Sequence, residues 1–238
     1  MALSVIIPTL NEEKDLPRCL DSLKGLAGEI IIIDSGSKDK TLELAKSAKA
    51  RIINHPFTSF SETRNFGDKQ ANGEWILSTE ADVSISPELA KEISSAIDSS
   101  EYDAYYIGRR NFIWGEEVKH SDWGPKDDRH IWLYRKGVGS WQSLVHEEFV
   151  TEKRVDELKN YLIHNNYETI SEFVDKINKY SDLAIKQKQY FPNWWFIRDF
   201  FKRFFYKLGF LDGYRGLFLS YLQAVYYLTL SVKRYTKN

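Results

Sequence analysis

The chain has 238 residues, of which 42% are apolar and 28% charged, so it is long enough for one or two domains with a sizeable buried core. This balance excludes a disordered, collagen-like or low-complexity protein. The lone cysteine, Cys19, excludes an internal disulfide framework and a cysteine-based zinc site, and it favours a reducing compartment. The opening segment MALSVIIPTL has no basic region and contains Pro8, so it predicts a strand rather than a signal peptide.

The net charge of −1 conceals an uneven distribution of charge along the chain. Residues 191–238 contain eight Lys or Arg and two Asp, a net charge of +6, so residues 1–190 carry −7. Aromatic side chains gather in the same region, where 12 of the 25 residues from Tyr190 to Tyr214 are Phe, Trp or Tyr. The sequence therefore predicts an acidic body followed by a basic, aromatic C-terminal extension.

The first hundred residues alternate between two hydrophobic periods. Short apolar runs bounded by turn residues predict buried parallel strands; they are Leu3–Ile7, Ile30–Ile33, Arg51–Asn54 and Trp75–Ser78. Helical patterns follow each run, and Ser37, Ser59 and Ser86 stand where helix caps are expected. Four strand–helix cycles predict an α/β fold with a parallel sheet.

The later residues change in pattern. Residues 102–110 and 130–135 predict further strands of a mixed sheet, separated by a polar loop at 114–128. An amphipathic helix is expected over 168–190, before the aromatic extension. We therefore expect a catalytic domain over 1–165, with a nucleotide-binding half (1–100) and an acceptor half (101–165), and a helical extension over 166–238.

Ligands of such a sheet bind beyond the carboxyl ends of its strands. Four segments lie there: Pro8 to Glu13, Asp34 to Ser37, His55 to Asn65 and Thr79 to Asp82. None contains a GxGxxG or Walker A pattern, which disfavours ordinary dinucleotide and P-loop NTPase sites. Each carboxylate in these segments has a structural alternative, as a solvated turn or a helix cap, and their shared position at one sheet edge is the argument for a site.

Several side chains are candidates for chemistry. Glu80 and Asp82, one residue apart at a strand end, suit a divalent cation with a bound diphosphate. Arg64 suits a diphosphate, although an arginine on a helix surface is the ordinary alternative. His146 is a possible metal ligand and Glu147 a possible general base, while Asp128 and its neighbour Asp127 are also candidates for proton abstraction. The residues by themselves do not rank these bases.

These segments resemble the ordered landmarks of the family 2 glycosyltransferases. The resemblance is carried by the motifs PTLNEE (8–13), IDSGSKDKT (33–41), TRN (63–65) and GEWILSTEAD (73–82). It continues through YIGRRN (106–111), LYRKG (133–137), VHE (145–147) and GFLDG (209–213), which are similar to the subgroup of bacterial lipopolysaccharide-core β-1,4-glucosyltransferases. The resemblance covers nearly the whole chain.

The resemblance implies a GT-A fold, a UDP-sugar donor, a divalent cation (Mn²⁺ or Mg²⁺) and inversion at the anomeric carbon. Carried over by position, Thr9, Glu12 and Asp34 would hold the base and ribose, Arg64 would lie near the diphosphate, and Asp82 would bind the metal. Pro8, Glu80 and Ala81 belong to the same segments and complete the expected donor site. The sequence departs from the family pattern in having Glu80 as the first carboxylate of the D-x-D motif and Val83 after it, and in the subgroup's D-x-Q appearing as Asp128-Arg-His130.

The extension is interpreted as an interfacial element. Its mixture of aromatic rings and cations is typical of a helix lying on an anionic membrane. Residues 216–232 contain no formal charge but are polar at Ser220, Gln223 and Thr229, which favours in-plane association over a crossing. The alternatives are a helix pair packed on the catalytic domain and a dimer interface.

We therefore expect an inverting, metal-dependent glycosyltransferase that moves a hexose, with glucose preferred, from a UDP-sugar to a lipopolysaccharide-core or other membrane-linked glycan. It would be cytoplasmic and peripheral on the inner face of the cytoplasmic membrane. The alternatives are transfer to a polyprenyl phosphate and a non-catalytic nucleotide-sugar-binding membrane scaffold. A nucleic-acid partner is not expected, because the basic residues alternate with bulky apolar ones and the body is acidic.

Overall fold

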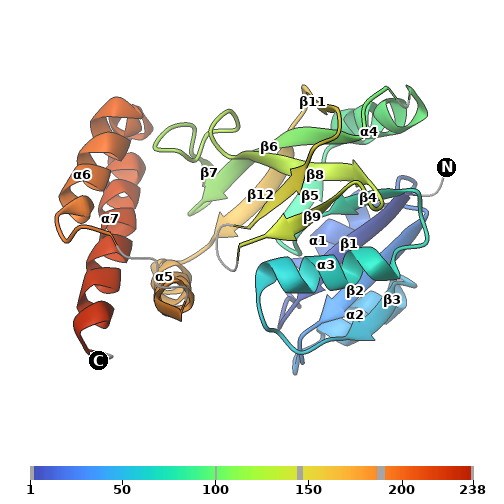
Figure 1. Ribbon diagram of the computed structural model, residues 1–238, viewed down its shortest axis with the longest axis horizontal. Helices are drawn as coiled ribbons and strands as arrows, with labels where there is room; N and C mark the ends of the chain where they lie inside the picture. The colour runs from blue at the N-terminus through green and yellow to red at the C-terminus, as the bar shows by residue number, and fades with distance from the viewer. Residues whose placement is uncertain (1–2, 100, 144–146, 187–190, 237–238) are drawn as a thin grey trace. The chain divides into compact units, whose positions relative to one another are not determined.

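The computed structural model describes residues 3–99, 101–143, 147–186 and 191–236 (Figure 1). The chain divides into two compact units. The sheet unit comprises residues 1–109 and 129–164, and the helical unit comprises residues 110–128 and 165–238. The segment 110–128, expected as part of the acceptor half, thus belongs with the C-terminal helices.

The sheet unit begins with four parallel strands, which confirms the four strand predictions. They are β1 (Leu3–Thr9), β2 (Glu29–Asp34), β3 (Arg51–Asn54) and β4 (Trp75–Ser78), in the spatial order β3-β2-β1-β4. The order reverses at β1, because the first two crossovers run one way and the third runs the other. As a result α1 (Leu16–Ser22) and α2 (Thr41–Ser47) cover one face and α3 (Phe60–Gln70) covers the other (Figure 1). Crevices at such reversals are the usual ligand sites of open α/β sheets.

Antiparallel strands extend this sheet and confirm that it is mixed. β8 (Arg129–Arg135) runs antiparallel to β4, and β6 (Ala104–Ile113) runs antiparallel to β8. The remaining elements of the unit are β5 (Val83–Ile85), α4 (Pro87–Ser99), β9 (Gly139–Gln142), β10 (Glu148–Thr151), β11 (Val155–Glu157) and β12 (Leu162–Tyr167). β9 and β10 form a hairpin, and β12 pairs with β5 so that His164 lies opposite Val83.

The core explains how α3 is seated. The strands bury Ile6 and Ile33 completely, and a Cβ at Gly67 would lie 2.6 Å from the Ile6 Cγ2 atom. A side chain at position 67 would therefore force α3 away from the sheet. Pro8 is tolerated in a central strand because the pairing of β1 with β4 ends at Ile6, before the missing N–H is needed.

Two of the three predicted helix caps are confirmed. The Ser59 hydroxyl accepts a hydrogen bond from the Glu62 amide at 3.2 Å, and the Ser86 hydroxyl accepts one from the Leu89 amide. The prediction for Ser37 is wrong: α2 begins at Thr41, and the Ser37 hydroxyl donates to the Asp34 carboxylate instead. A short polar side chain beside a carboxylate can satisfy the loop rather than the helix.

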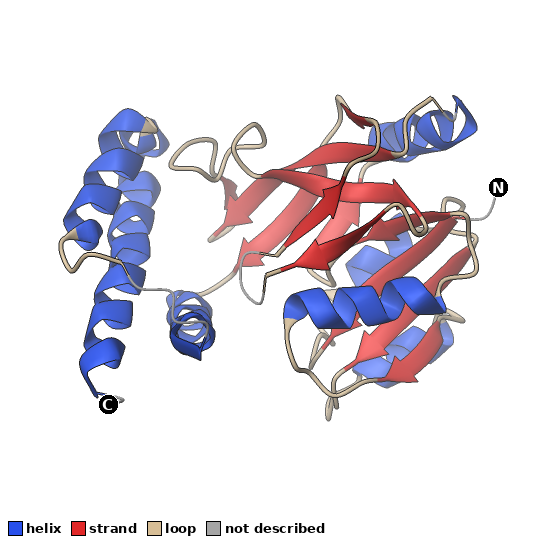
Figure 2. Ribbon diagram, viewed as in Figure 1, coloured by secondary structure: helices blue, strands red, loops and turns tan. Residues whose placement is uncertain are grey.

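The helical unit is mostly α-helix (Figure 2). Its elements are the end of β6 paired with β7 (Glu116–Glu117), α5 (Ile170–Lys186), α6 (Trp195–Phe201), the π-helical turn η1 (Lys202–Tyr206), the 3₁₀ turn η2 (Gly209–Asp212) and α7 (Gly213–Thr236). Among the described helices, none combines the length and apolar character that crossing a membrane requires.

Candidate active site

The ends of β1 and β2 form the first part of the site. Thr9 and Asp34 are buried opposite each other in register, and the Thr9 hydroxyl lies 3.3 Å from Asp34 Oδ1. The other carboxylate oxygen accepts hydrogen bonds from the Gly36 and Ser37 amides at 2.9 and 3.0 Å. Gly36 has φ +104°, a conformation that L side chains rarely adopt. Asp34 therefore organises its own loop, with a glycine at the turn.

The neighbouring loop after β1 is tied to the same place. The Asn11 amide donates to Ser37 Oγ, and the Glu12 amide donates to Thr41 Oγ1 at 2.7 Å. These bonds link the two loops that were expected to hold the base and ribose. The structure thus brings Thr9, Glu12 and Asp34 together at one edge of the sheet.

The turn after β4 and strand β12 together carry a cluster of three possible metal ligands. Glu80, Asp82 and His164 present ligand atoms that all lie within 4.8 Å of one another. His164 Nε2 lies 3.2 Å from Asp82 Oδ2 and 3.8 Å from Glu80 Oε2. Ala81 is buried in the turn between the two carboxylates. The two carboxylates follow β4, the strand next to β1 on the far side of the reversal in strand order.

Arg64 organises the groups around this cluster. Its side chain is 1% exposed, and its Nη2 donates to Glu80 Oε1 at 2.8 Å while its Nε donates to Glu147 Oε1 at 3.2 Å. Nη1 donates to the Ser78 hydroxyl and to the Thr79 carbonyl. The guanidinium expected near the diphosphate is thus directed at protein acceptors, and it joins the Glu80 carboxylate to that of Glu147.

The aromatic walls and a second arginine complete this arrangement. The Arg64 guanidinium lies 5.1 Å from the Trp132 ring and 4.8 Å from the Trp141 ring. Arg109, near the middle of β6, donates to Glu80 Oε2 at 3.1 Å and also lies over Trp132. Planar guanidinium groups stack on aromatic faces and bond carboxylates at once, which lysine does not do.

Electrostatics keep these groups charged. Burial alone raises the pKa of Glu80, but Arg109 and Arg64 outweigh it and hold the pKa below its ordinary value. Burial alone lowers the pKa of Arg64, but Glu80 and Glu147 outweigh it and raise the pKa. Glu80 therefore stays an anion at neutral pH, because it lies between two arginines.

The donor set fits a divalent cation. Two carboxylates and one imidazole offer hard oxygen atoms and one nitrogen atom, a set that Mn²⁺ accepts more readily than Mg²⁺, which prefers oxygen ligands. Glu80 is also bonded to Arg64 and Arg109, and His164 Nε2 contacts Asp82 Oδ2, so all three candidate ligands have other partners as well.

Two predicted residues are not among these groups of the sheet unit. Asp128 belongs to the helical unit, where it is buried and accepts a hydrogen bond from Asn111 Nδ2 at 2.7 Å. His146 lies outside the described residues. Sequence reasoning missed His164 and Arg109, whose nearest signals were a histidine in the alternating run LIHNNY and the first arginine of a pair.

Comparisons with known proteins identify the family. Residues 4–151 match the family model of glycosyl transferase family 2. The chain is 31% identical to an uncharacterized glycosyltransferase of Rickettsia typhi over 237 residues, which covers 89% of this chain and 80% of the relative. It is 28% identical to the lipopolysaccharide core biosynthesis glycosyltransferase LpsC of Rhizobium meliloti, over 94% of this chain and 91% of the relative.

A solved structure shares the fold. S. aureus TarS in complex with UDP-GlcNAc superposes with a TM-score of 0.53 at 20% identity, over 78% of this chain and 66% of that one. The expected GT-A fold is confirmed. With a parallel sheet that reverses at β1, a carboxylate-rich turn after β4 and a family match over more than half of its length, the chain belongs to glycosyltransferase family 2.

Proposed function

We propose that this glycosyltransferase is an inverting, metal-dependent enzyme that moves a hexose from a UDP-sugar to a lipopolysaccharide-core or other membrane-linked glycan. The observation that carries the proposal is the Glu80–Asp82–His164 cluster, joined through Arg64 to Glu147. The cluster suits a diphosphate with its cation, and Glu147 supplies a carboxylate near it. The name of LpsC supports the acceptor class, and the ligand of TarS supports a UDP-sugar donor.

The chain's own residues would divide the work as follows. The loops after β1 and β2 would bind the nucleoside. Thr9 and Asp34 would shape these loops, and Glu12 would face the nucleoside. Asp82 and His164 would hold the cation. Glu80 would fix Arg64 and Arg109, whose positive charges would favour the negative charge that grows on the departing diphosphate.

Transfer then requires a base on the acceptor side. The acceptor hydroxyl would attack the anomeric carbon from the face opposite the diphosphate, and Glu147 would take its proton as the bond to UDP breaks. We prefer Glu147 to Asp128 because Glu147 lies in the same unit as the cation cluster and is linked to it through Arg64. A bound divalent cation would supply stabilisation of the diphosphate charge.

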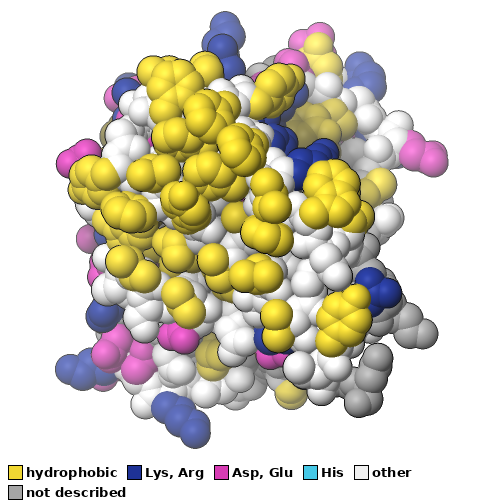
Figure 3. All heavy atoms as spheres, turned by 90° about the vertical axis from the view of Figure 1, so that its left-hand side faces the viewer, with side chains coloured by type: hydrophobic (Ala, Val, Ile, Leu, Met, Phe, Trp, Pro, Cys, Tyr) yellow, Lys and Arg dark blue, Asp and Glu magenta, His cyan; other side chains and the backbone are white. Residues whose placement is uncertain are grey.

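The helical unit offers a surface for a membrane-linked acceptor. One of its faces is densely apolar (Figure 3). Large apolar side chains that are more than 40% exposed gather on α6, η1, η2 and α7; they include Trp194, Ile197, Phe201, Phe205, Tyr206, Leu208, Phe210, Leu211, Tyr214, Phe218, Tyr221, Val225 and Leu228. A patch of this kind is larger than soluble monomers usually expose.

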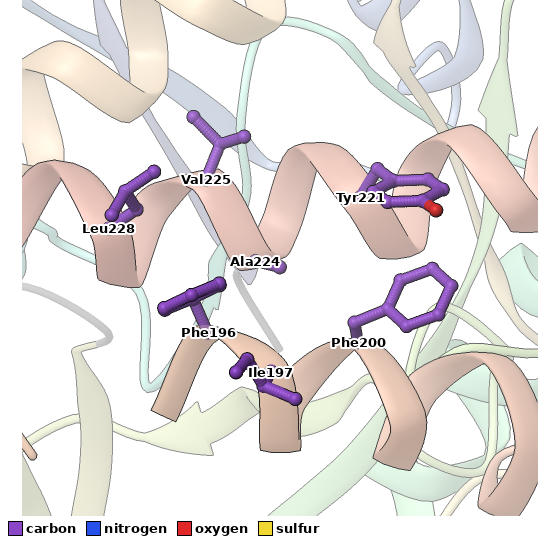
Figure 4. Close-up of a pocket in the computed structure, with 7 residues that line it drawn as sticks. All are labelled: Phe196, Ile197, Phe200, Tyr221, Ala224, Val225 and Leu228. Atoms are coloured by element: carbon purple, nitrogen blue, oxygen red, sulfur yellow. The ribbon is translucent and has the colours of Figure 1, made fainter. Parts of the chain in front are cut away.

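A groove between α6 and α7 continues this face. It has a volume of about 300 Å³ and an apolar lining (Figure 4). The lining residues are Phe196, Ile197, Phe200, Tyr221, Ala224, Val225 and Leu228. We infer that this face lies in the plane of a membrane, with the protein peripheral on the inner face of the cytoplasmic membrane.

Several cations of the extension pair with carboxylates of the same unit. Lys202 and Lys207 pair with Asp122, Arg215 pairs with Glu116, and Lys233 pairs with Asp182. These cations have partners within the unit, so we infer that membrane contact would depend on apolar burial more than on attraction to anionic lipid.

Release of UDP tests the transferase proposal directly. Purified protein with Mn²⁺, a set of UDP-hexoses and lipopolysaccharide-core acceptors should release UDP only when donor and acceptor are both present. Asp82→Ala should abolish release. Binding of UDP without release under any donor, acceptor or cation would favour the nucleotide-sugar-binding scaffold, and release with a polyprenyl phosphate alone would move the acceptor class to that lipid.

A further inference from the structure

Helix α3 makes one contact with β8 and two with the β9–β10 hairpin. Arg64 reaches Glu147, which directly precedes β10. Asn65 makes two hydrogen bonds with the backbone of Trp141 in β9, donating to its carbonyl at 2.8 Å and accepting from its amide at 2.9 Å. Asp68, one helical turn after Arg64, accepts a hydrogen bond from the Tyr134 hydroxyl at 2.9 Å. These contacts set the register of the hairpin against α3.

Tyr134 is the centre of these contacts. It is 1% exposed, and its hydroxyl accepts a hydrogen bond from Trp141 Nε1 at 2.8 Å, so its own proton is directed to Asp68. Its ring stacks on Phe149 with centroids 3.8 Å apart and planes 19° apart. Phe149 lies in β10, two residues after Glu147. One side chain therefore contacts both strands of the hairpin and the helix beneath it.

A half-buried carboxylate at Asp68 is costly for a purely structural contact. Burial raises the pKa of Asp68 to about 7, against the lowering effects of the Tyr134 hydrogen bond and of the charges on Arg64 and Lys136. Packing alone would be served by an apolar side chain at lower cost. A fully satisfied polar network instead specifies one arrangement of its members.

We propose that Asn65, Asp68 and Tyr134 are positioning residues, which hold the β9–β10 hairpin on α3 so that the Glu147 carboxylate stays against Arg64. The proposal rests on the proposed function, in which Glu147 is the base. This proposal goes beyond the proposed function, because it assigns the placement of the base to three residues that do not touch the reacting groups.

The test compares four variants of the full chain. Tyr134→Phe removes the hydroxyl and keeps the ring. Asp68→Ala removes the acceptor, and Asp68→Asn keeps an acceptor oxygen for Tyr134. Tyr105→Phe is the matched control, because the Tyr105 hydroxyl is also buried but donates to the Ala96 carbonyl of α4.

Two readouts do not depend on turnover. The first is hydrogen exchange of the Trp141 amide. The second is the carboxyl carbon resonance of Glu147, assigned by its loss in Glu147→Gln. Tyr134→Phe and Asp68→Ala should speed exchange about tenfold, as expected for one buried hydrogen bond, and shift the resonance. Asp68→Asn should restore both, and Tyr105→Phe should change neither.

Kinetics provide the third readout. With the donor and acceptor found by UDP release, Tyr134→Phe and Asp68→Ala should lower kcat about tenfold and leave the KM for the donor unchanged. A folded Tyr134→Phe with normal exchange and a normal Glu147 resonance would overturn the proposal, and so would failure of Asp68→Asn to rescue Asp68→Ala. Absence of turnover in the natural chain would defeat the proposed function, while exchange and resonance would still decide the positioning role. If Tyr134→Phe does not fold, the two Asp68 variants decide it.

Discussion

His164 Nε2 lies 3.2 Å from Asp82 Oδ2, although 82 residues separate them in the chain. The pairing of β12 with β5 creates this proximity, because it sets His164 opposite Val83, the residue that follows Asp82. Val83, one of the positions where the sequence departs from the family pattern, is therefore a buried strand residue. The third member of the cluster comes from the other strand of that pair.

The first prediction concerns the cation. His164→Ala and Asp82→Ala should each lower the affinity for Mn²⁺ and remove the Mn²⁺-dependent part of UDP binding, because each removes one of the two proposed cation ligands. Calorimetric titration with UDP, with and without Mn²⁺, measures both effects. His120→Ala is the matched control, since this histidine belongs to the helical unit and contacts Asp212 there. Unchanged Mn²⁺ dependence in His164→Ala would remove this residue from the site.

The second prediction separates the two candidate bases. Glu147→Gln should lower kcat by about 10²- to 10⁴-fold while UDP binding is retained, because the amide keeps the size of the side chain but cannot take a proton. Asp128→Asn should have little effect on kcat. A collapse of turnover in Asp128→Asn with near-normal turnover in Glu147→Gln would reverse the assignment.

The third prediction concerns stability and pH. Burial raises the pKa of Asp68 from 3.8 to about 7, so between these values the folded state holds a proton that the unfolded state has released. The free energy of unfolding should therefore fall as the pH rises from about 4 to 7, and this contribution is constant above that. Asp68→Asn should remove the fall, so that it is more stable than the natural chain at about pH 8 and loses this advantage near pH 4. Urea unfolding at several pH values measures the free energy of unfolding of both proteins. A difference between them that does not change with pH would contradict the raised pKa of Asp68.

The fourth prediction tests the membrane face. The protein should sediment with neutral and with anionic vesicles to a similar extent, and added salt should weaken this little, because cations such as Lys202, Arg215 and Lys233 are paired internally. Phe218→Asp should reduce sedimentation, since it places a charge on the apolar face, where Phe218 is 51% exposed. Val150→Asp, at a similarly exposed apolar residue in the sheet unit, is the control. Loss of a dimer in Phe218→Asp with unchanged sedimentation would identify the face as a contact between copies.

The sequence by itself was sufficient to predict the succession of strands and helices along the first hundred residues. Apolar runs such as Ile30–Ile33 and caps such as Ser59 are local signals, because a strand or a helix end is specified by residues within a few positions of one another. The turn Thr79 to Asp82 was likewise placed at a strand end by its own neighbours. The family follows from these ordered motifs, and the matching family model confirms it.

Only the tertiary structure decided what those residues contact. Arg64 was expected near a diphosphate, but its burial between Trp132 and Trp141 and its bonds to Glu80 and Glu147 depend on β8 and on the hairpin. No local pattern linked His164 to Glu80 and Asp82, since their proximity arises from the pairing of two strands far apart in the chain. The cations of the extension could not be assigned partners either, because residues 110–128, distant in sequence, supply several of them. Side-chain partners across a sheet or between helices are set by pairing and packing at long range, which local patterns do not contain.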